Sequence, residues 1–270
     1  MSGGRDAAVT ALRERMAMYA EEDVCVAFSG GVDSSLLLAE AVEAAENSGN
    51  RVYAVTFQTK LHPATDLLAA EAVAEELGVT QHIIVIDELA QAGIEDNPKN
   101  RCYLCKRALF ARLKLFAERM GAQWCLDGTN ADDLRQYRPG LQALAELHIE
   151  SPLAELGFSK AQVRALAKER GLSVAQRPST PCMATRLPYG AHLDYELLKR
   201  IDRAEAWLRR QLGGNVRLRL HGDIARIEVD AQAIPKAAGM AEEIVTHLKA
   251  LGFVHITLDL RGFRSGSMDE

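Results

Sequence analysis

The chain has 270 residues, 48% of them hydrophobic, and a formal net charge of −5 at pH 7. This length suits one large domain and one small one, and the apolar content allows a sizeable core. The acidic balance argues against a general nucleic-acid coat, so we expect no nucleic-acid partner. The sequence has no run of roughly 20 apolar residues for a membrane span and no apolar signal-peptide core. We therefore expect a cytoplasmic protein without a membrane partner.

Strand-like and helix-like patterns alternate over the first two-thirds of the chain, beginning with a helix over residues 5–20. The elements expected next are strands over 24–28, 51–57, 82–86 and 123–126, and helices over 34–46, 65–77 and 101–120. A polar loop is expected over 90–100. This alternation is typical of the α/β class, with an open, Rossmann-like parallel sheet and helices on both faces.

The pattern changes near Pro178, where a proline-rich stretch over 177–190 predicts a long ordered loop. The elements expected after it are a helix over 194–212, strands over 216–220 and 224–229, a helix over 235–251 and a strand over 254–260. This order predicts a smaller C-terminal α+β domain. We therefore divide the chain into domains over 1–176 and 177–270.

The first strand is followed by a loop suited to phosphate binding. Its sequence is Ser29-Gly30-Gly31-Val32-Asp33-Ser34-Ser35. The two glycines permit tight backbone geometry, and their amides, with the N-terminus of the next helix, can surround a pyrophosphate. The three serines add hydroxyl donors, whereas the carboxylate at position 33 is expected to face Mg²⁺. A Ser/Gly-rich turn with a helix cap is the plainer alternative.

The loop has neither the lysine of the P-loop nor the glycine spacing of a dinucleotide site. It resembles instead the loop of the pyrophosphatase-loop (PP-loop) ATPases, which include GMP synthetase, NAD synthetase, asparagine synthetase and tRNA-thiolating enzymes. The resemblance implies that ATP, with Mg²⁺, is cleaved between its α and β phosphates. It also implies that AMP passes to a carbonyl or carboxyl oxygen.

Two further strand ends suit a nucleotide pocket, because ligands of parallel sheets bind at the carboxyl ends of the strands. Thr56 lies in the second strand, where backbone groups could contact adenine. Gly128 follows the fourth strand and could let a ribose approach closely. Each of these segments is also compatible with an ordinary strand end.

Five cysteines in a reducing compartment argue against disulfides and for metal binding or catalysis. Cys102 and Cys105 form a Cys-x-x-Cys pair at a helix start, where two thiolates can bind one metal. Structural zinc is disfavoured because a closed site needs four ligands and Cys182 is the only third candidate. Cys25 and Cys125 lie in apolar strands and are expected in the core.

A series of short segments occurs in order along the chain and carries a resemblance that covers about residues 10 to 262. The segments are Arg101–Lys106, Asp127–Thr129, Asp132–Asp133, Arg138–Gly140, Ser151–Leu153, Pro178–Cys182, Arg186–Gly190, Val216–Arg219 and Ile224–Glu228. Together they resemble the LarE family. The resemblance implies an enzyme that adenylates a carboxylate of a pyridinium dicarboxylate mononucleotide and converts it to a thiocarboxylate, during synthesis of the nickel-pincer cofactor of lactate racemase. It also implies homo-oligomers, hexamers among them.

The LarE resemblance implies one of two sulfur sources. In one, Cys182 forms an adduct with the activated substrate and loses its sulfur, which leaves dehydroalanine. In the other, three cysteines hold a [4Fe–4S] cluster with an extra sulfide, which a sulfide or persulfide donor can replace. Because Cys102, Cys105 and Cys182 are all present, we favour the cluster as the sulfur source.

Arg217 and Arg219 are two positions apart on a predicted strand, so both side chains point to one face. Two guanidinium groups on one face suit a phosphate monoester. The LarE resemblance implies that they bind the phosphate of the acceptor, that Thr185 adds a hydroxyl, and that Glu205 lies near the reacting group. A solvated edge face guarded by charge is the alternative.

Three other functions remain open. A tRNA-thiolating PP-loop enzyme is disfavoured by the pI of about 5.9 and the lack of an added RNA-binding module. Amide synthesis would need an ammonia source, and the sequence contains no glutaminase domain. A nucleotide sensor without catalysis would leave the three cysteines without a role.

Overall fold

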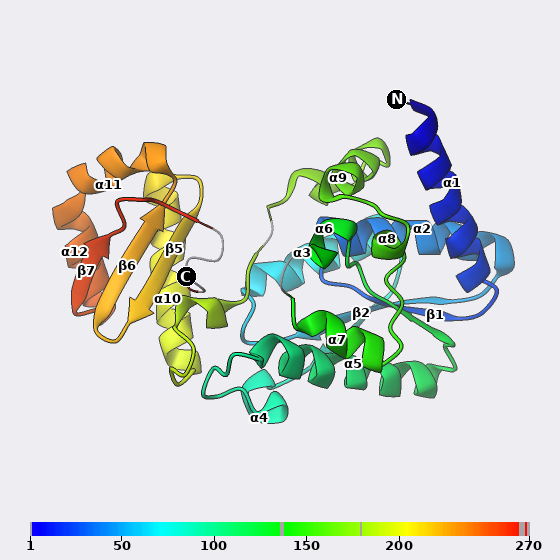
Figure 1. Cartoon of the computed structure of the whole chain (residues 1–270), viewed down its shortest axis with the longest axis horizontal. Coiled ribbons are helices and arrows are strands. Elements are labelled where there is room, and N and C mark those ends of the chain that lie inside the picture. The colour runs from blue at the N-terminus through cyan, green and yellow to red at the C-terminus, as the bar shows by residue number, and fades with distance from the viewer. Residues whose placement is uncertain (1, 136–137, 179, 265–267, 269–270) are drawn as a thin grey trace. The chain divides into compact units, whose positions relative to one another are not determined.

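The computed structural model describes residues 2–135, 138–178, 180–264 and 268. The chain divides into two units (Figure 1). The first comprises Met1–Gly93 and Asn100–Thr180, and the second comprises Ile94–Lys99 and Pro181–Glu270. Among the described residues, no helix combines the length and the apolar character that crossing a membrane requires.

Four parallel strands form the sheet of the first unit, in the order β3-β2-β1-β4. Their bounds are β1 Val24–Ala27, β2 Val52–Gln58, β3 Gln81–Val85 and β4 Trp124–Leu126. In the register, Val24 of β1 pairs with Val52 on one side and with Trp124 on the other. The predicted open parallel sheet is therefore confirmed.

Side chains of β1 point alternately to the two faces of this sheet. Val24 and Val26 belong to an apolar cluster shared with four helices. These are α1 Ser2–Tyr19, α2 Val32–Ser48, α3 Ala64–Glu76 and α9 Lys160–Glu169. Cys25 and Cys125 belong to a second cluster, with residues of α5 Arg101–Met120 and α7 Gly140–Glu146. Helices thus cover both faces, as predicted (Figure 1), and both thiols are core groups.

Several helices between residues 88 and 169 were not predicted from the sequence. They are α4 Glu88–Ala92, α6 Ala131–Leu134, α7, α8 Pro152–Glu155 and α9. Asn130 begins α6 in a capping box with Asp133, and Ser159 begins α9 in a capping box with Gln162. The helices of four to seven residues offer too few positions for a periodic apolar pattern, and only the caps of α6 and α9 mark where these two helices begin.

A three-stranded sheet in the order β5-β6-β7 forms the second unit, with β5 and β6 antiparallel and β6 and β7 parallel. The elements are α10 Tyr195–Leu212, β5 Val216–His221, β6 Ile224–Val229, α11 Ile234–Gly239, α12 Ala241–Ala250 and β7 His255–Leu258. Gly222, with a φ of 58°, makes the tight turn from β5 to β6. The predicted small α+β fold is confirmed, although the helix expected over 235–251 is divided at Met240.

The segment Ile94–Lys99 belongs to the second unit, although elements of the first unit flank it in the sequence. Asn97 is fully buried, and its Nδ2 donates to the carbonyl oxygens of Pro188 at 2.8 Å and Leu187 at 3.2 Å. Its own carbonyl accepts the N–H of Gly190. The sequence predicted only a polar loop here. It did not indicate that this segment hydrogen-bonds to the chain between residues 184 and 193.

Candidate active site

The loop over residues 29–35 lies at the point where the strand order reverses. Strand β1 is flanked by β2 and β4, so the loops that follow β1 and β4 emerge side by side at the carboxyl edge of the sheet. Open α/β sheets bind ligands at such a switch point. The geometry thus brings together the predicted loop and the segment that contains Gly128.

The structure explains why glycine stands at both positions of the loop. Gly30 has a φ of +68°, and a Cβ there would lie 2.6 Å from the backbone N and Cα of Ala70 in α3. Gly31 is the N-cap of α2 and has no side chain to cap the first helical turn. The N–H groups of that turn therefore keep their ability to bind an anion.

The serines of the loop form a small network. Ser34 Oγ lies 3.1 Å from Ser29 Oγ and donates to the carbonyl oxygen of Gly31 at 3.2 Å. Ser35 is fully buried, and its Oγ has no hydrogen-bond partner among the described residues. An oxygen of a bound ligand would satisfy this hydroxyl, which otherwise costs the fold free energy.

Asp33, expected to face Mg²⁺, is held by a cation of the protein. Its carboxylate is ion-paired with Lys160 at the start of α9 and accepts a hydrogen bond from Asn130 Nδ2 at 3.2 Å. Within the described ranges, no three His, Cys, Asp or Glu side chains are grouped to hold a metal. A magnesium ion at Asp33 would have to obtain most of its ligands from phosphate oxygens and water, and its binding there stays a prediction.

The other two predicted nucleotide contacts are engaged inside the fold. A Cβ on Gly128 would lie 2.7 Å from the backbone N of Ser34, so the close approach that requires this glycine is to the nucleotide loop itself. Thr56 is buried, and its hydroxyl donates to the carbonyl oxygen of Phe28 at 2.7 Å and accepts from Gln81. Their contacts with a nucleotide remain predictions.

Sequence reasoning missed two cations at the loop. Besides Lys160, the guanidinium of Arg177 donates to the carbonyl oxygen of Gly30 at 3.0 Å and to Asp66 at 2.6 Å. Both basic residues follow the loop by more than a hundred positions, so no local pattern marks them. They place positive charge at a phosphate-binding loop that has no lysine of its own.

The three candidate cysteines are divided between the units. Cys102 and Cys105 lie one turn apart at the start of α5, the first exposed and the second half-buried. Cys182 is half-buried and precedes the short 3₁₀ helix η2, Met183–Arg186, in the second unit. The first unit therefore brings two of the thiols together, and a site that combines all three remains a prediction.

Arg217 and Arg219 point to one face of β5, but they do not form a solvated edge. Their exposed fractions are 8% and 4%, which excludes the alternative of charged side chains guarding an edge. Arg219 pairs with the buried Glu228 at 3.2 Å and donates to the carbonyl oxygen of Thr185 at 2.7 Å. Burial lowers the pKa of Arg219.

Arg217 lacks a carboxylate partner among the described residues. One of its Nη atoms donates to the carbonyl oxygen of Val216 at 2.7 Å, and its guanidinium lies 5.2 Å from the ring centroid of Phe263. Its Nε is buried without a partner in the described part of the chain. Burial, with repulsion from Arg186, lowers the pKa of Arg217 to about 10. A buried, unneutralised guanidinium favours an anion beside it.

Glu205 is bound to a residue that the sequence analysis did not single out. Arg186 donates from Nε and Nη2 to the two oxygens of Glu205, at 2.8 and 2.9 Å. Its Nη1 reaches the carbonyl oxygen of Cys182 at 3.3 Å and Thr185 Oγ1 at 3.0 Å. Arg186 thus joins Thr185, Glu205 and residues 181–182, which we call the thiol segment, in one network within the second unit.

Comparison with known proteins identifies the family. A family model described as asparagine synthase matches residues 4–251. The pyridinium-3,5-bisthiocarboxylic acid mononucleotide synthase of Lactiplantibacillus plantarum is 36% identical over 247 residues, which cover 92% of this chain and 89% of that protein. The chain belongs to the LarE-like PP-loop ATP pyrophosphatases. It is therefore a member of a family of adenylating enzymes.

Other relatives of this LarE-like chain differ in how much of it they match. An uncharacterised protein of Synechocystis sp. is 37% identical over 246 residues, or 90% of this chain and 91% of that protein. The tRNA-specific 2-thiouridylase MnmA of Dinoroseobacter shibae is 32% identical over 204 residues, but these cover only 59% of this chain and 50% of that enzyme. The similarity to the LarE-like proteins therefore extends over both units, whereas the similarity to the thiouridylase covers only part of the chain.

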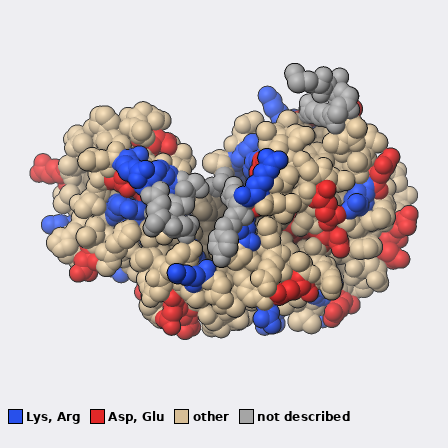
Figure 2. Space-filling view, in the orientation of Figure 1, with Lys and Arg blue, Asp and Glu red and all other residues tan. Residues whose placement is uncertain are grey.

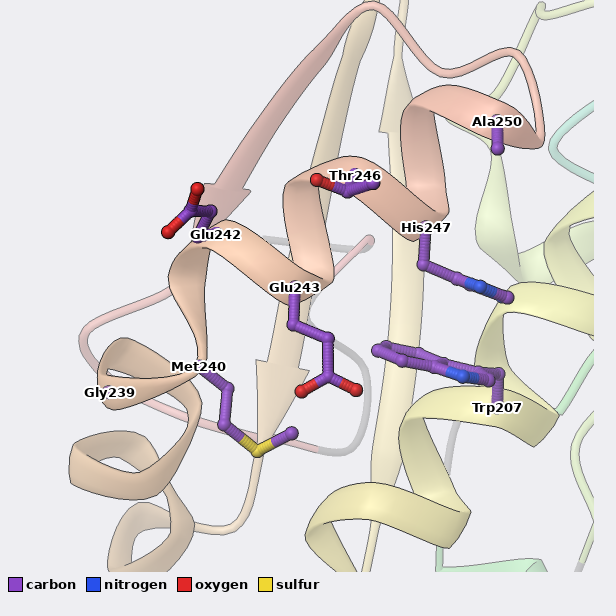
Figure 3. A pocket seen from close by; sticks show the side chains of 8 residues that line it. All are labelled: Trp207, Gly239, Met240, Glu242, Glu243, Thr246, His247 and Ala250. Carbon is purple, nitrogen blue, oxygen red and sulfur yellow. The ribbon is translucent and has the colours of Figure 1, made fainter.

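The second unit has a surface groove of about 680 Å³, lined by residues between Trp207 and Ala250 (Figure 3). Trp207 of α10 stacks on His247 of α12 in it, with ring centroids 4.1 Å apart and planes inclined by 12°. None of the predicted site residues lines this groove. On the face shown in Figure 2, acidic and basic side chains are interspersed in both units rather than forming a coat of one sign.

Proposed function

We propose that this LarE-like enzyme adenylates a carboxylate of a pyridinium dicarboxylate mononucleotide and replaces one of its oxygens by sulfur. The observation that carries the proposal is the pair of buried arginines, Arg217 and Arg219, on one face of β5 and next to the thiol segment. Arg217 has a buried Nε without a partner among the described residues. Arg219 contacts Thr185, which itself donates to the carbonyl oxygen of Cys182 at 2.8 Å. An anion-binding group next to a thiol suits a phosphate-bearing acceptor of sulfur.

Activation is assigned to the nucleotide loop of the first unit. A carboxylate oxygen of the acceptor attacks the α-phosphorus of ATP, the bond to the bridging α–β oxygen breaks, and pyrophosphate leaves. The N–H groups at the start of α2, with Ser29 and Ser34, stabilise the charge of the leaving group. Asp33 would hold the magnesium ion that accompanies the phosphates.

Sulfur transfer completes the reaction. A sulfur nucleophile forms a bond to the activated carboxyl carbon, the C–O bond to AMP breaks, and AMP leaves with the electron pair. The product is a thiocarboxylate. The phosphate of the acceptor binds to Arg217 and Arg219, while the pair of Arg186 and Glu205 holds the thiol segment in place.

An iron–sulfur cluster is the sulfur source we favour, and the pair of Cys102 and Cys105 supports it. Cys102 is exposed and Cys105 is half-buried, and they lie one turn apart at the start of α5, where two thiolates can bind one metal. With Cys182 as the third ligand, a [4Fe–4S] cluster would keep one iron open to carry a replaceable sulfide. An external sulfide or persulfide donor would restore that sulfide.

A second sulfur source has its own support. Cys182 is the cysteine that shares a unit with Arg217 and Arg219, and its carbonyl is bound by Thr185 and Arg186. Cys182 could therefore supply the sulfur: once its thiolate has displaced AMP, loss of the Cα proton and cleavage of the Cβ–S bond would release the thiocarboxylate and leave dehydroalanine. Each protein molecule would then work once.

Anaerobic purification followed by iron and sulfide assays tests the source. We expect bound iron and sulfide, and we expect multiple turnover to be lost when Cys102 and Cys105 are changed to alanine. Absence of a cluster after anaerobic reconstitution, with loss of one H₂S from the Cys182 peptide after turnover, would favour the sacrificial thiol. The oligomeric state, expected to be a homo-oligomer, can be read from light scattering on the same sample.

The remaining candidates differ in what they bind and release. The partial similarity to tRNA thiouridylases keeps tRNA as an acceptor to be tested by a binding assay. A nucleotide sensor would bind ATP without releasing pyrophosphate. Pyrophosphate release that depends on the pyridinium mononucleotide, with no tRNA binding, supports the proposed function over both.

A further inference from the structure

The nucleotide loop is hydrogen-bonded to Arg177, the first residue of the linker over residues 177–182 that leads to Cys182. Its own seven residues include Asp33 but no lysine or arginine. Arg177 supplies a guanidinium from outside, donating to the carbonyl oxygen of Gly30 at 3.0 Å. The other arm of the same guanidinium pairs with Asp66 at 2.6 Å, in the first turn of α3. One side chain thus links the loop, α3 and the linker.

The backbone on the N-terminal side of this link is fixed. Arg164 of α9 donates to the carbonyl oxygen of Ala175 at 2.7 Å and to that of Arg177 itself at 2.9 Å. The chain is therefore anchored up to residue 177, after which Pro178 can donate no backbone hydrogen bond. Cys182 follows only five positions after Arg177, so the link lies close to the thiol segment along the chain.

The contact between Arg177 and the loop is one that a phosphate can replace. A backbone carbonyl is a neutral acceptor, whereas a phosphate accepts charge-assisted, bidentate hydrogen bonds that are about twice as strong. The Arg177 and Asp66 side chains are 24% and 18% exposed, so the pair is partly shielded from water and still reachable. The guanidinium is hydrogen-bonded to the carbonyl oxygen of Gly30, the residue whose positive φ makes the bend of the loop.

We propose that Arg177 is a positioning residue that exchanges the Gly30 carbonyl for a phosphate of the bound nucleotide and thereby couples occupancy of the loop to the reactivity of Cys182. The thiol segment changes its accessibility when the nucleotide is bound. The inference rests on the proposed function in one respect, which is that ATP binds to the 29–35 loop. It holds for either source of the sulfur.

The test compares R177A, R177K and the wild-type protein. An ATP analogue with a methylene group between the α and β phosphates is titrated by calorimetry. The alkylation rate of Cys182 by iodoacetamide is then followed by peptide mass spectrometry, with and without saturating analogue. R119A is the matched control, because Arg119 in α5 hydrogen-bonds, within the described part of the chain, only to the carbonyl oxygen of Leu115 in its own helix.

In the wild type and in R119A, we expect the analogue to change the alkylation rate of Cys182 by roughly threefold or more. R177A should bind the analogue about tenfold more weakly, and its Cys182 should keep the rate of the nucleotide-free protein even at saturation. R177K retains the positive charge but cannot form the two hydrogen bonds of a guanidinium. It should therefore recover part of the affinity for the analogue but not the response of Cys182.

The opposite results would overturn the inference. If R177A, or R177K should R177A not fold, shows the wild-type response of Cys182 to the analogue, Arg177 is only a structural clamp. A wild-type rate that does not respond to saturating analogue also contradicts the coupling. Failure of the wild type to bind the analogue at all would instead contradict the proposed use of ATP, which separates the two claims.

Discussion

Arg186 and Glu205 form a bidentate ion pair whose side chains are only 2% and 1% exposed. Glu205 also accepts the backbone N–H of Leu218 at 2.9 Å. The pair therefore fastens η2, which follows the thiol segment, to both α10 and β5. Removal of one partner would leave the other charged and buried.

Changing Glu205 to alanine should lower the free energy of unfolding by about 3–5 kcal/mol, because Arg186 loses its carboxylate in a water-free site. R209A is the control. Arg209 also reaches Glu205, at 3.4 Å, but its side chain is 44% exposed, so its loss should cost less than about 1 kcal/mol. Urea denaturation measures both values. Equal losses in the free energy of unfolding would show that the buried pair contributes no more stability than the exposed one.

The two arginines of β5 should respond differently to replacement by methionine. R219M leaves the buried Glu228 with one fewer partner and should be destabilising by about 2 kcal/mol or more. R217M removes a buried charge that has no carboxylate partner among the described residues, so it should be neutral or stabilising. Both should lose affinity for the phosphate of the acceptor. Denaturation and calorimetry separate these outcomes, and a strong destabilisation by R217M would contradict them.

The stability of the protein should depend on pH through Arg217. Its pKa of about 10 in the fold lies below the ordinary value of an arginine side chain, mainly because of burial. Between these two values the unfolded chain binds more protons at this residue, so the free energy of unfolding rises with pH. The free energy of unfolding of the wild type minus that of R217M should therefore rise between about pH 9 and 11 and stay constant near neutrality. A difference that decreases over this range would contradict the burial of a charged guanidinium.

The glycines of the nucleotide loop should not tolerate a methyl group. In G30A the new Cβ meets the backbone of Ala70, and in G128A it meets that of Ser34, so both should lose most ATP binding. G49A is a suitable control, since Gly49 also has a positive φ but a Cβ added there would have no neighbouring atom within 4 Å. It should cost only about 1 kcal/mol. Full ATP affinity in G30A would show that the loop does not need this geometry.

Some of the site could be predicted from the sequence because its causes are local. The strand, the glycine-containing loop and the helix follow one another directly, and the positive φ of Gly30 occurs where the loop sequence requires it. The period of two along a strand placed Arg217 and Arg219 on one face. These features depend on neighbouring positions in the chain.

The rest of the site depends on contacts between distant positions. Arg177, Lys160 and Asn97 act on segments tens to more than a hundred residues away, and no local pattern marks them. Burial of the β5 arginines was also hidden, because charge on a strand more often indicates a solvated face. Packing of η2 and α10 against β5 determined the outcome.

The central claim is that this enzyme couples adenylation to sulfur transfer onto a phosphate-bearing pyridinium carboxylate. The most direct measurement incubates the anaerobically purified protein with Mg²⁺, ATP and the pyridinium dicarboxylate mononucleotide, and quantifies pyrophosphate, AMP and product by mass spectrometry. We predict acceptor-dependent release of pyrophosphate and AMP in equal amounts, with one oxygen of the acceptor replaced by sulfur for each AMP. Release of ADP, or of pyrophosphate without any sulfur-containing product, would contradict the account.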